Sequence, residues 1–159
     1  MTETKYRDWL TKDEADAFIG NNSPYYLDKW KTHSNSPRKG WNWAAVFFGI
    51  AWMAYRKMYL EAILSSILFM LISFGIEVIL GAFQMSLNEQ FYPVAFQIFA
   101  GGFGNVLYRN KALRILRKTM DLNEKKRLDF LRAKGGVSIV GSVICVLIVA
   151  TLAILSILL

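Results

Sequence analysis

The last 23 residues of the chain, Val137 to Leu159, contain no charged side chain. As an α-helix this run would extend about 34 Å at about 1.5 Å per residue, which exceeds the roughly 30 Å hydrocarbon core of a bilayer. A second run, Leu60 to Phe83, is interrupted only by Glu61 and Glu77. Because 54% of the residues are hydrophobic and only 19% are charged, the sequence predicts an all-α integral membrane protein rather than a soluble domain.

A third and weaker candidate span runs from about Phe91 to Tyr108, where polar residues and glycines dilute the apolar ones. The segment that joins it to the preceding run, Gln84 to Tyr92, is short and contains no Lys or Arg. We therefore expect residues 60–108 to form a transmembrane hairpin, with the glycines of the third run allowing close helix packing. A buried helix pair in a soluble protein is the alternative, and the uncharged final run argues against it.

The positive charges predict the orientation of these spans. Residues 1–59 hold nine Lys and Arg, residues 60–108 hold none, and residues 109–136 hold ten. If residues 60–108 cross the membrane and return, all nineteen cations lie on one side, which the positive-inside rule assigns to the cytoplasm. The final run, residues 137–159, then crosses once more. We expect three spans, with the N-terminus in the cytoplasm and the C-terminus outside.

The fifteen residues from Trp41 to Tyr55 are uncharged and rich in aromatic rings. As a helix they would reach only about 22 Å, too short for a span, and a span here would divide the cations between the two sides. Apolar residues occupy both faces, unlike those of a helix that lies flat on a membrane. We infer a re-entrant or interfacial segment over residues 41–57, bent near Gly49. The aromatic residues of this predicted wedge are Trp41, Trp43, Phe47, Phe48, Trp52, Tyr55 and Tyr59.

Two short amphipathic helices are predicted in the cytoplasmic N-terminal segment, residues 1–40. Thr11 begins a capping-box pattern, and Gly20 is a stop signal for the first helix. Ser23, which precedes a proline, is the predicted cap of the second. Thr32 to Gly40 has the composition of a loop and holds the single histidine, His33.

The basic arm, residues 109–136, is predicted to be helical and cytoplasmic. Apolar residues recur in it at helical spacing, and Asp121 with Glu124 is predicted to cap a second helical piece. Beside a membrane, such a cluster of cations favours anionic lipid headgroups over nucleic acid. The residues predicted to contact headgroups, including two at the cytoplasmic boundary of the aromatic wedge, are Arg56, Lys57, Arg109, Lys111, Arg114, Arg117 and Lys118.

Glu77 is the strongest candidate for an intramembrane site. An ionisable residue within a span is energetically costly, which indicates a function. Counting back from a turn near Asn88 makes Gln97 its predicted hydrogen-bonding partner, and Asn105 is the next polar residue of that span. One hypothesis is a proton or cation relay through Glu77 and Gln97. We favour a Glu77 that pins two helices together.

Catalytic chemistry has little support in the sequence. The chain has one Cys, Cys145, and one His, so no Cys/His metal cluster is possible and no nucleophile has a convergent base. We therefore expect no enzymatic activity, no metal and no cofactor.

The block WNWAAVFFGIAWMAYRKMYLEA (Trp41 to Ala62), with NVLYRNKAL (Asn105 to Leu113) after it, resembles a family of small bacterial inner-membrane proteins known only as a domain of unknown function. Family members often carry Gly-Pro where this chain has Gly49-Ile50. The predicted bend therefore rests on Gly49 alone, and a continuous tilted helix stays an alternative. The resemblance implies a multi-pass protein of the bacterial inner membrane, and it supplies no established activity to carry over.

We expect a non-enzymatic membrane protein with a regulatory, assembly or immunity-type role, acting through helix packing and contact with anionic lipid. Its expected partners are the bilayer and either another membrane protein or further copies of itself. A small oligomeric transporter or channel that uses Glu77 is the alternative.

Overall fold

The computed structural model describes residues 10–31, 40–88 and 90–158, and this part of the chain contains helices and no strand. The helices are α1 (Lys12–Ile19), α2 (Ser23–Lys31), α3 (Trp43–Tyr55), α4 (Tyr59–Ala82), α5 (Phe91–Arg117), α6 (Glu124–Lys134) and α7 (Ile139–Leu158). The predicted all-helical class is confirmed. The predicted loop at residues 32–40, with His33, lies outside the described residues except for Gly40.

Among the described residues, two helical stretches are long and apolar enough, by length and composition, to cross a membrane. One is α4. The other falls within residues 124–152, and its apolar part is α7, because α6 is highly charged. α5 does not meet the same criterion, since polar residues and glycines dilute its first half and cations its second.

The short N-terminal helix begins and ends where the sequence predicts. The Thr11 hydroxyl accepts from the Glu14 amide, and the Glu14 carboxylate accepts from the Thr11 amide, which completes the capping box. Gly20 ends the helix with a φ of 80°. Two other predicted caps differ. Ser23 donates its hydroxyl to Asp16 of α1, and Asn123, rather than Asp121 with Glu124, caps α6 by accepting from the Lys126 amide.

α5 continues without a break from the predicted third span into the basic arm. The predicted boundary at residue 108 therefore falls inside a helix. A change from apolar to basic residues need not end a helix, because Arg, Lys, Leu and Ala all have high helix propensity. The arm consequently has two parts, the second half of α5 and the separate helix α6.

α4 and α5 form the predicted antiparallel hairpin, as three contacts along its length show. Glu61 at the start of α4 pairs with Arg114 near the end of α5. In the middle, the Phe69 and Phe96 rings meet edge to face at 5.4 Å. Near the tip, the Tyr92 hydroxyl donates to Glu77.

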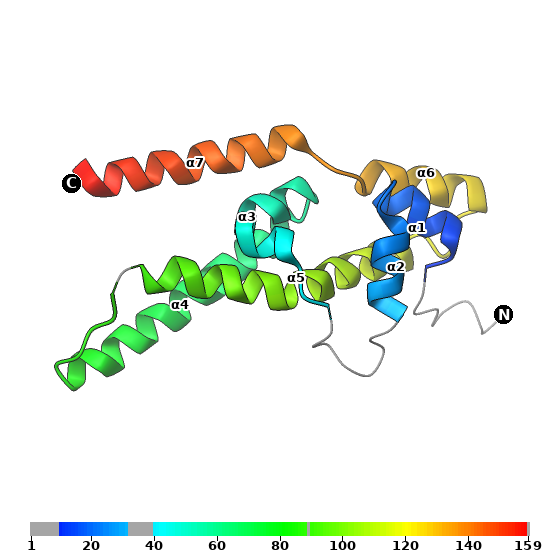
Figure 1. Cartoon of the computed structure of the whole chain (residues 1–159). Coiled ribbons are helices and arrows are strands. Elements are labelled where there is room, and N and C mark those ends of the chain that lie inside the picture. Colours follow the sequence, from blue (N-terminus) through cyan, green and yellow to red (C-terminus); the bar gives the residue numbers. More distant parts are fainter. Residues whose placement is uncertain (1–9, 32–39, 89, 159) are drawn as a thin grey trace.

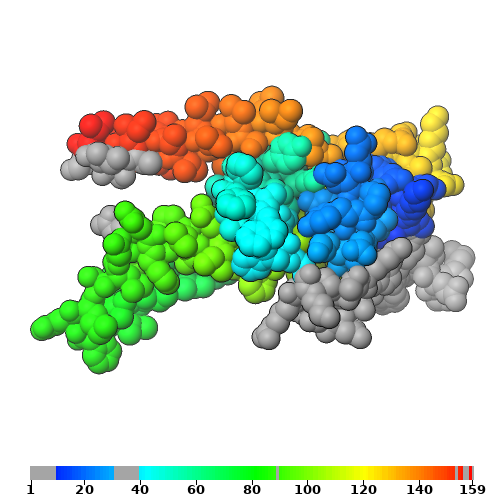
Figure 2. Space-filling view, viewed as in Figure 1, coloured from blue at the N-terminus to red at the C-terminus, as the bar shows by residue number. Residues whose placement is uncertain are grey.

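Polar and apolar elements gather at opposite ends of the molecule (Figure 1). The α4–α5 turn and the end of α7 lie at one end, whereas α1, α2 and α6 pack together at the other. Large apolar side chains of α4 and α7 are exposed along most of their length, and a gap separates α7 from the hairpin in the space-filling view (Figure 2). The buried core lies at the polar end and around α3. It contains Phe18, Tyr26, Trp30, Trp52, Met53, Tyr108, Leu116 and Leu131.

Candidate functional site

The aromatic block forms α3, which packs against both α5 and α7 at the centre of the molecule. Its helix is broken at Gly49, where φ is 46° and ψ is −118°. The bend predicted at this residue is confirmed, without a proline after it. Only glycine adopts such a conformation without steric cost, so Gly49 is sufficient to turn the chain. The continuous tilted helix is excluded.

Two buried asparagines hold the beginning of α3. Asn42 caps the helix by accepting from the Ala45 amide at 3.0 Å, and its side-chain amide donates to the Asn105 side-chain oxygen at 2.9 Å. Asn105 in turn donates to the Gly40 carbonyl, and the Asn42 backbone amide donates to the Gly101 carbonyl at 2.9 Å. We call Asn42 and Asn105 the asparagine clasp. Asn105, predicted as part of an intramembrane polar site, is a buried structural residue here.

Glycines on α5 let α3 approach closely. A Cβ atom at Gly101 would lie 2.2 Å from Val46 Cγ2, and one at Gly104 would lie 3.0 Å from the Trp52 ring. Such distances leave no room for a side chain, since carbon atoms pack at about 3.5–4.0 Å. The predicted role of these glycines in helix packing is confirmed for Gly101 and Gly104.

The end of α3 is closed by a left-handed residue and a buried lysine. Lys57 has a φ of 55°, and the Lys57 and Met58 amides donate back to Ala54 and Met53, as in a Schellman motif. Lys111 of α5 then donates from Nζ to the Arg56 and Lys57 carbonyls, each at 2.9 Å. Burial lowers the pKa of Lys111 to about 8.

Arg56 is buried among tyrosine rings. Its guanidinium carbon lies 4.9 Å from the Tyr26 ring centroid, 5.4 Å from that of Tyr108 and 5.6 Å from that of Tyr55. Burial raises the pKa of Tyr26, so the ring stays neutral and offers its face to the cation. The aromatic cage fixes α3 against α2 and α5.

These positions restrict the predicted headgroup contacts. Arg56 and Lys111 are 4% and 5% exposed, so neither reaches a lipid surface. Instead, Lys111 donates to backbone carbonyls and Arg56 stacks on tyrosine rings. Lys57 and Arg109 are half-buried. Arg114, Arg117 and Lys118 are exposed on the second half of α5, and Arg114 is paired with Glu61.

The predicted wedge divides at the bend. In its first half, Trp43, Phe47 and Phe48 are about two-thirds exposed and Trp41 is more than one-third exposed. In its second half, Trp52 is 5% exposed and packs on Tyr108, and Tyr55 is half-buried. Tyr59, at the start of α4, is exposed. Only the first half of α3 is therefore an outward aromatic surface.

Glu77 does not meet Gln97. The hairpin turns earlier than a turn at Asn88 would allow, which brings Tyr92 rather than Gln97 level with the carboxylate. Gln97 lies further along α5 from the hairpin turn, beside Gly49. The predicted pinning of α4 to α5 by Glu77 is present with Tyr92 as its partner.

Ser142 of α7 and Ser138, directly before that helix, complete the contacts around α3, and the sequence reasoning missed both. The Ser142 hydroxyl donates to the Ala51 carbonyl at 3.2 Å, and the Ser138 amide donates to the Tyr55 carbonyl at 2.7 Å. Ser138 also caps α7 by accepting from the Gly141 amide. Ser138 directly before the last apolar run was an available cap signal. No comparable signal marked Ser142.

The comparisons with known proteins place the chain in one family. No curated protein and no solved structure matches it. The model of the family described as Protein of unknown function (DUF2628) matches residues 12–114, which cover α1 to α4 and most of α5. Since this match covers more than half of the chain, the protein belongs to the DUF2628 family.

Proposed function

We propose that the protein is an integral protein of the bacterial inner membrane with three spans, α4, the first half of α5, and α7. The observation that supports this proposal is the separation of apolar and basic surfaces along the molecule. Large apolar side chains of α4 and α7 are exposed along both helices, while residues 109–136, which include the second half of α5 and α6, hold ten of the nineteen cations. In water such an apolar surface would be costly, whereas in a bilayer it is solvated by lipid.

The positions of the helix ends support the proposed orientation. The α4–α5 turn and the end of α7 lie at the same end of the molecule (Figure 1), as a hairpin tip and a C-terminus outside the cell require. The basic half would then face the cytoplasm. The exposed rings of Trp41 and Trp43 would enter the cytoplasmic interface, where Trp is enriched.

We further propose that the protein acts without enzymatic chemistry, as a platform for a membrane partner or for further copies of itself. Its buried polar groups support this. Asn42, Asn105 and Lys111 bind one another or backbone carbonyls, and Arg56 stacks on tyrosine rings. The exposed cations Arg117 and Lys118 would contact anionic headgroups, each with about 1 kcal/mol of attraction near the surface.

Membrane extraction followed by crosslinking tests this function. Bacterial membranes that contain the tagged protein would be washed with alkaline carbonate, and intact cells would be treated with a membrane-permeant lysine crosslinker. We expect the protein to stay in the washed membranes and to crosslink to a second copy or another membrane protein. Release by carbonate would contradict the integral location, and a membrane-bound monomer without crosslinked protein would contradict the platform.

A small transporter is the second candidate, because Tyr92, whose hydroxyl donates to Glu77, also lines an apolar cavity within the proposed membrane region. Proteoliposomes of the wild type and of Glu77→Gln would be compared for proton and cation flux. Transport through Glu77 requires flux that the substitution abolishes. Equal flux, or none from either protein, would refute it.

A further inference from the structure

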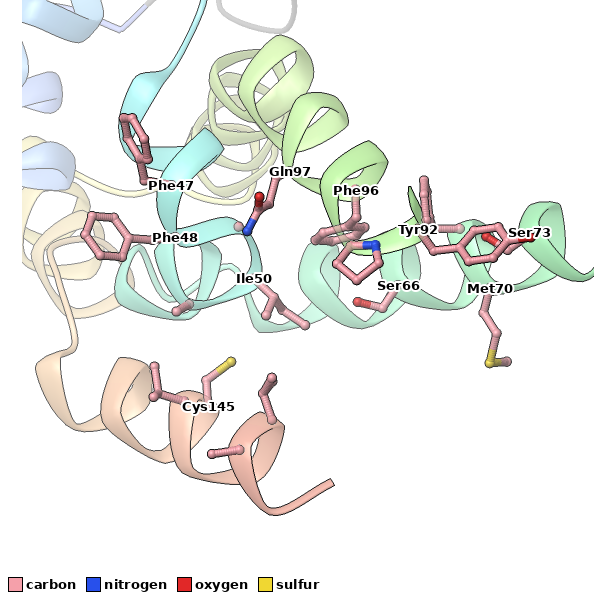
Figure 3. Close-up of a pocket in the computed structure, with 17 residues that line it drawn as sticks. Phe47, Phe48, Ile50, Ser66, Met70, Ser73, Tyr92, Phe96, Gln97 and Cys145 are labelled. Carbon is pink, nitrogen blue, oxygen red and sulfur yellow. The ribbon is translucent and has the colours of Figure 1, made fainter. Parts of the chain in front are cut away.

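An apolar cavity of about 750 Å³ lies between α3, α4, α5 and α7 (Figure 3). This volume is within the range of about 300–1,000 Å³ that is typical of small-molecule sites. Phe47, Phe69 and Phe96 provide part of its lining, and Val146 and Val149 of α7 form another part. It is therefore large enough for a specific ligand and is built from four separate helices.

The bend in α3 shapes one wall of this cavity. Five consecutive residues, 47 to 51, line it. In an unbroken helix, consecutive residues point in directions about 100° apart, so five in a row cannot face one side. The break at Gly49 turns both halves of α3 toward the same space. Both halves of α3 therefore contribute residues to the wall of the cavity.

Three neutral polar groups face this otherwise apolar space. They are the Gln97 amide of α5 and the hydroxyls of Ser66 and Ser73 on α4 (Figure 3). No hydrogen bond joins any of the three to another described residue. A polar group left in an apolar site without a partner is costly, whereas a ligand that bonds to it recovers that cost. No Lys, Arg, Asp or Glu is among the described residues that line the cavity, so an ionised group would find no counter-charge from them.

We propose that the cavity binds one molecule drawn from the bilayer, with a flexible apolar chain and a neutral carbonyl group that accepts from Gln97. This rests on the membrane location proposed above. An acyl ester of a phospholipid and the ring carbonyl of an isoprenoid quinone share this chemistry. The chain would lie against the phenylalanines and valines, and any charged headgroup would stay outside the cavity.

Two neighbouring residues of α7 provide a matched pair of variants. Val149 lines the cavity and Ile148 does not, although their side chains are similarly exposed, at 48% and 55%. Val149→Trp would fill part of the cavity, whereas Ile148→Trp adds the same ring on the outer side of the helix. Gln97→Leu removes the amide with little change in volume and provides a second variant should Val149→Trp fold poorly.

The single cysteine offers a readout within the cavity, since Cys145 is also a lining residue. Protein retained in carbonate-washed membranes would be purified in detergent and depleted of lipid. Alkylation of Cys145 by N-ethylmaleimide would then be timed with and without dioleoyl phosphatidylglycerol or a short-chain ubiquinone. Mass spectrometry of the protein before depletion would identify the molecule that it retains from the membrane.

We expect one of the two probes to slow alkylation in the wild type and in Ile148→Trp. The probe should bind about tenfold more weakly to Val149→Trp, through overpacking, and about threefold to tenfold more weakly to Gln97→Leu, through one lost hydrogen bond. No protection by either probe, equal protection in all variants, or a second copy of the chain as the protecting species would overturn the proposal. Each of these results leaves the membrane location intact, whereas release by carbonate would refute that location itself.

Discussion

Adding one methyl group at Gly101 should separate α3 from α5. The Cβ of Gly101→Ala would lie 2.2 Å from Val46 Cγ2, so α3 or the Val46 side chain must move by more than 1 Å to reach ordinary contact at about 3.5 Å. Overpacking of this kind costs about 1–3 kcal/mol. Replacing a mid-helix glycine by alanine recovers up to about 1 kcal/mol. We expect a net loss of up to about 2 kcal/mol in the free energy of unfolding.

Unfolding in detergent micelles, followed by circular dichroism, measures this loss. Gly75→Ala is the control, because a Cβ at Gly75 of α4 meets no atom within 4 Å, and it should leave stability unchanged or raise it slightly. Val46→Ala should rescue Gly101→Ala, since it removes the atom that clashes, so the double variant should be more stable than the two separate losses predict. If Gly101→Ala behaves like Gly75→Ala, or if Val46→Ala gives no rescue, the close packing of α3 on α5 is refuted.

Three further predictions concern residues that shape α3 or contact its end. Gly49→Ala should lower the free energy of unfolding by about 1–3 kcal/mol, because its positive φ is strained for any side chain; equal stability in the same micelle assay would exclude the bend. Lys57→Gly should raise stability by up to about 1 kcal/mol, since glycine adopts the left-handed conformation at the end of α3 without strain, and a loss would show that the Lys57 side chain matters more. The third concerns pH. The pKa of Lys111 is about 8 in the folded chain and 10.5 in the unfolded chain. Between these pH values the unfolded chain binds more protons. The free energy of unfolding should therefore rise with pH by about 3 kcal/mol across this window. Lys111→Met should abolish this rise, and a wild type with no such rise would contradict the buried ammonium.

Much of the fold could be predicted from local signals in the sequence. The capping box at Thr11, the glycine at residue 20 and the apolar periodicity each act within a few residues, and the helices begin and end near them. The hairpin followed from two apolar runs and a short connection. The continuation of α5 past residue 108 was not predicted, because composition changes there while helix propensity does not.

The contacts around α3 could not be predicted because they depend on tertiary distances. The sequence does not distinguish the buried Arg56 from the exposed Arg117, and both were predicted to contact lipid headgroups. Only the packing of three tyrosines, one from α2, shows that Arg56 lies inside. Likewise, the partner of Glu77 depended on a shift of a few residues in the position of the hairpin turn, which sequence alone does not specify.

Cysteine accessibility at two exposed sites tests the membrane arrangement most directly. Single cysteines would replace Ser86, in the α4–α5 connection, and Lys126 of α6, in a Cys145→Ser background. A maleimide that cannot cross the membrane would be added to intact spheroplasts and to lysed ones. We predict labelling of the cysteine at position 86 in intact spheroplasts and of the cysteine at position 126 only after lysis. Labelling of both positions from the same side would contradict the hairpin and, with it, the proposed three-span protein.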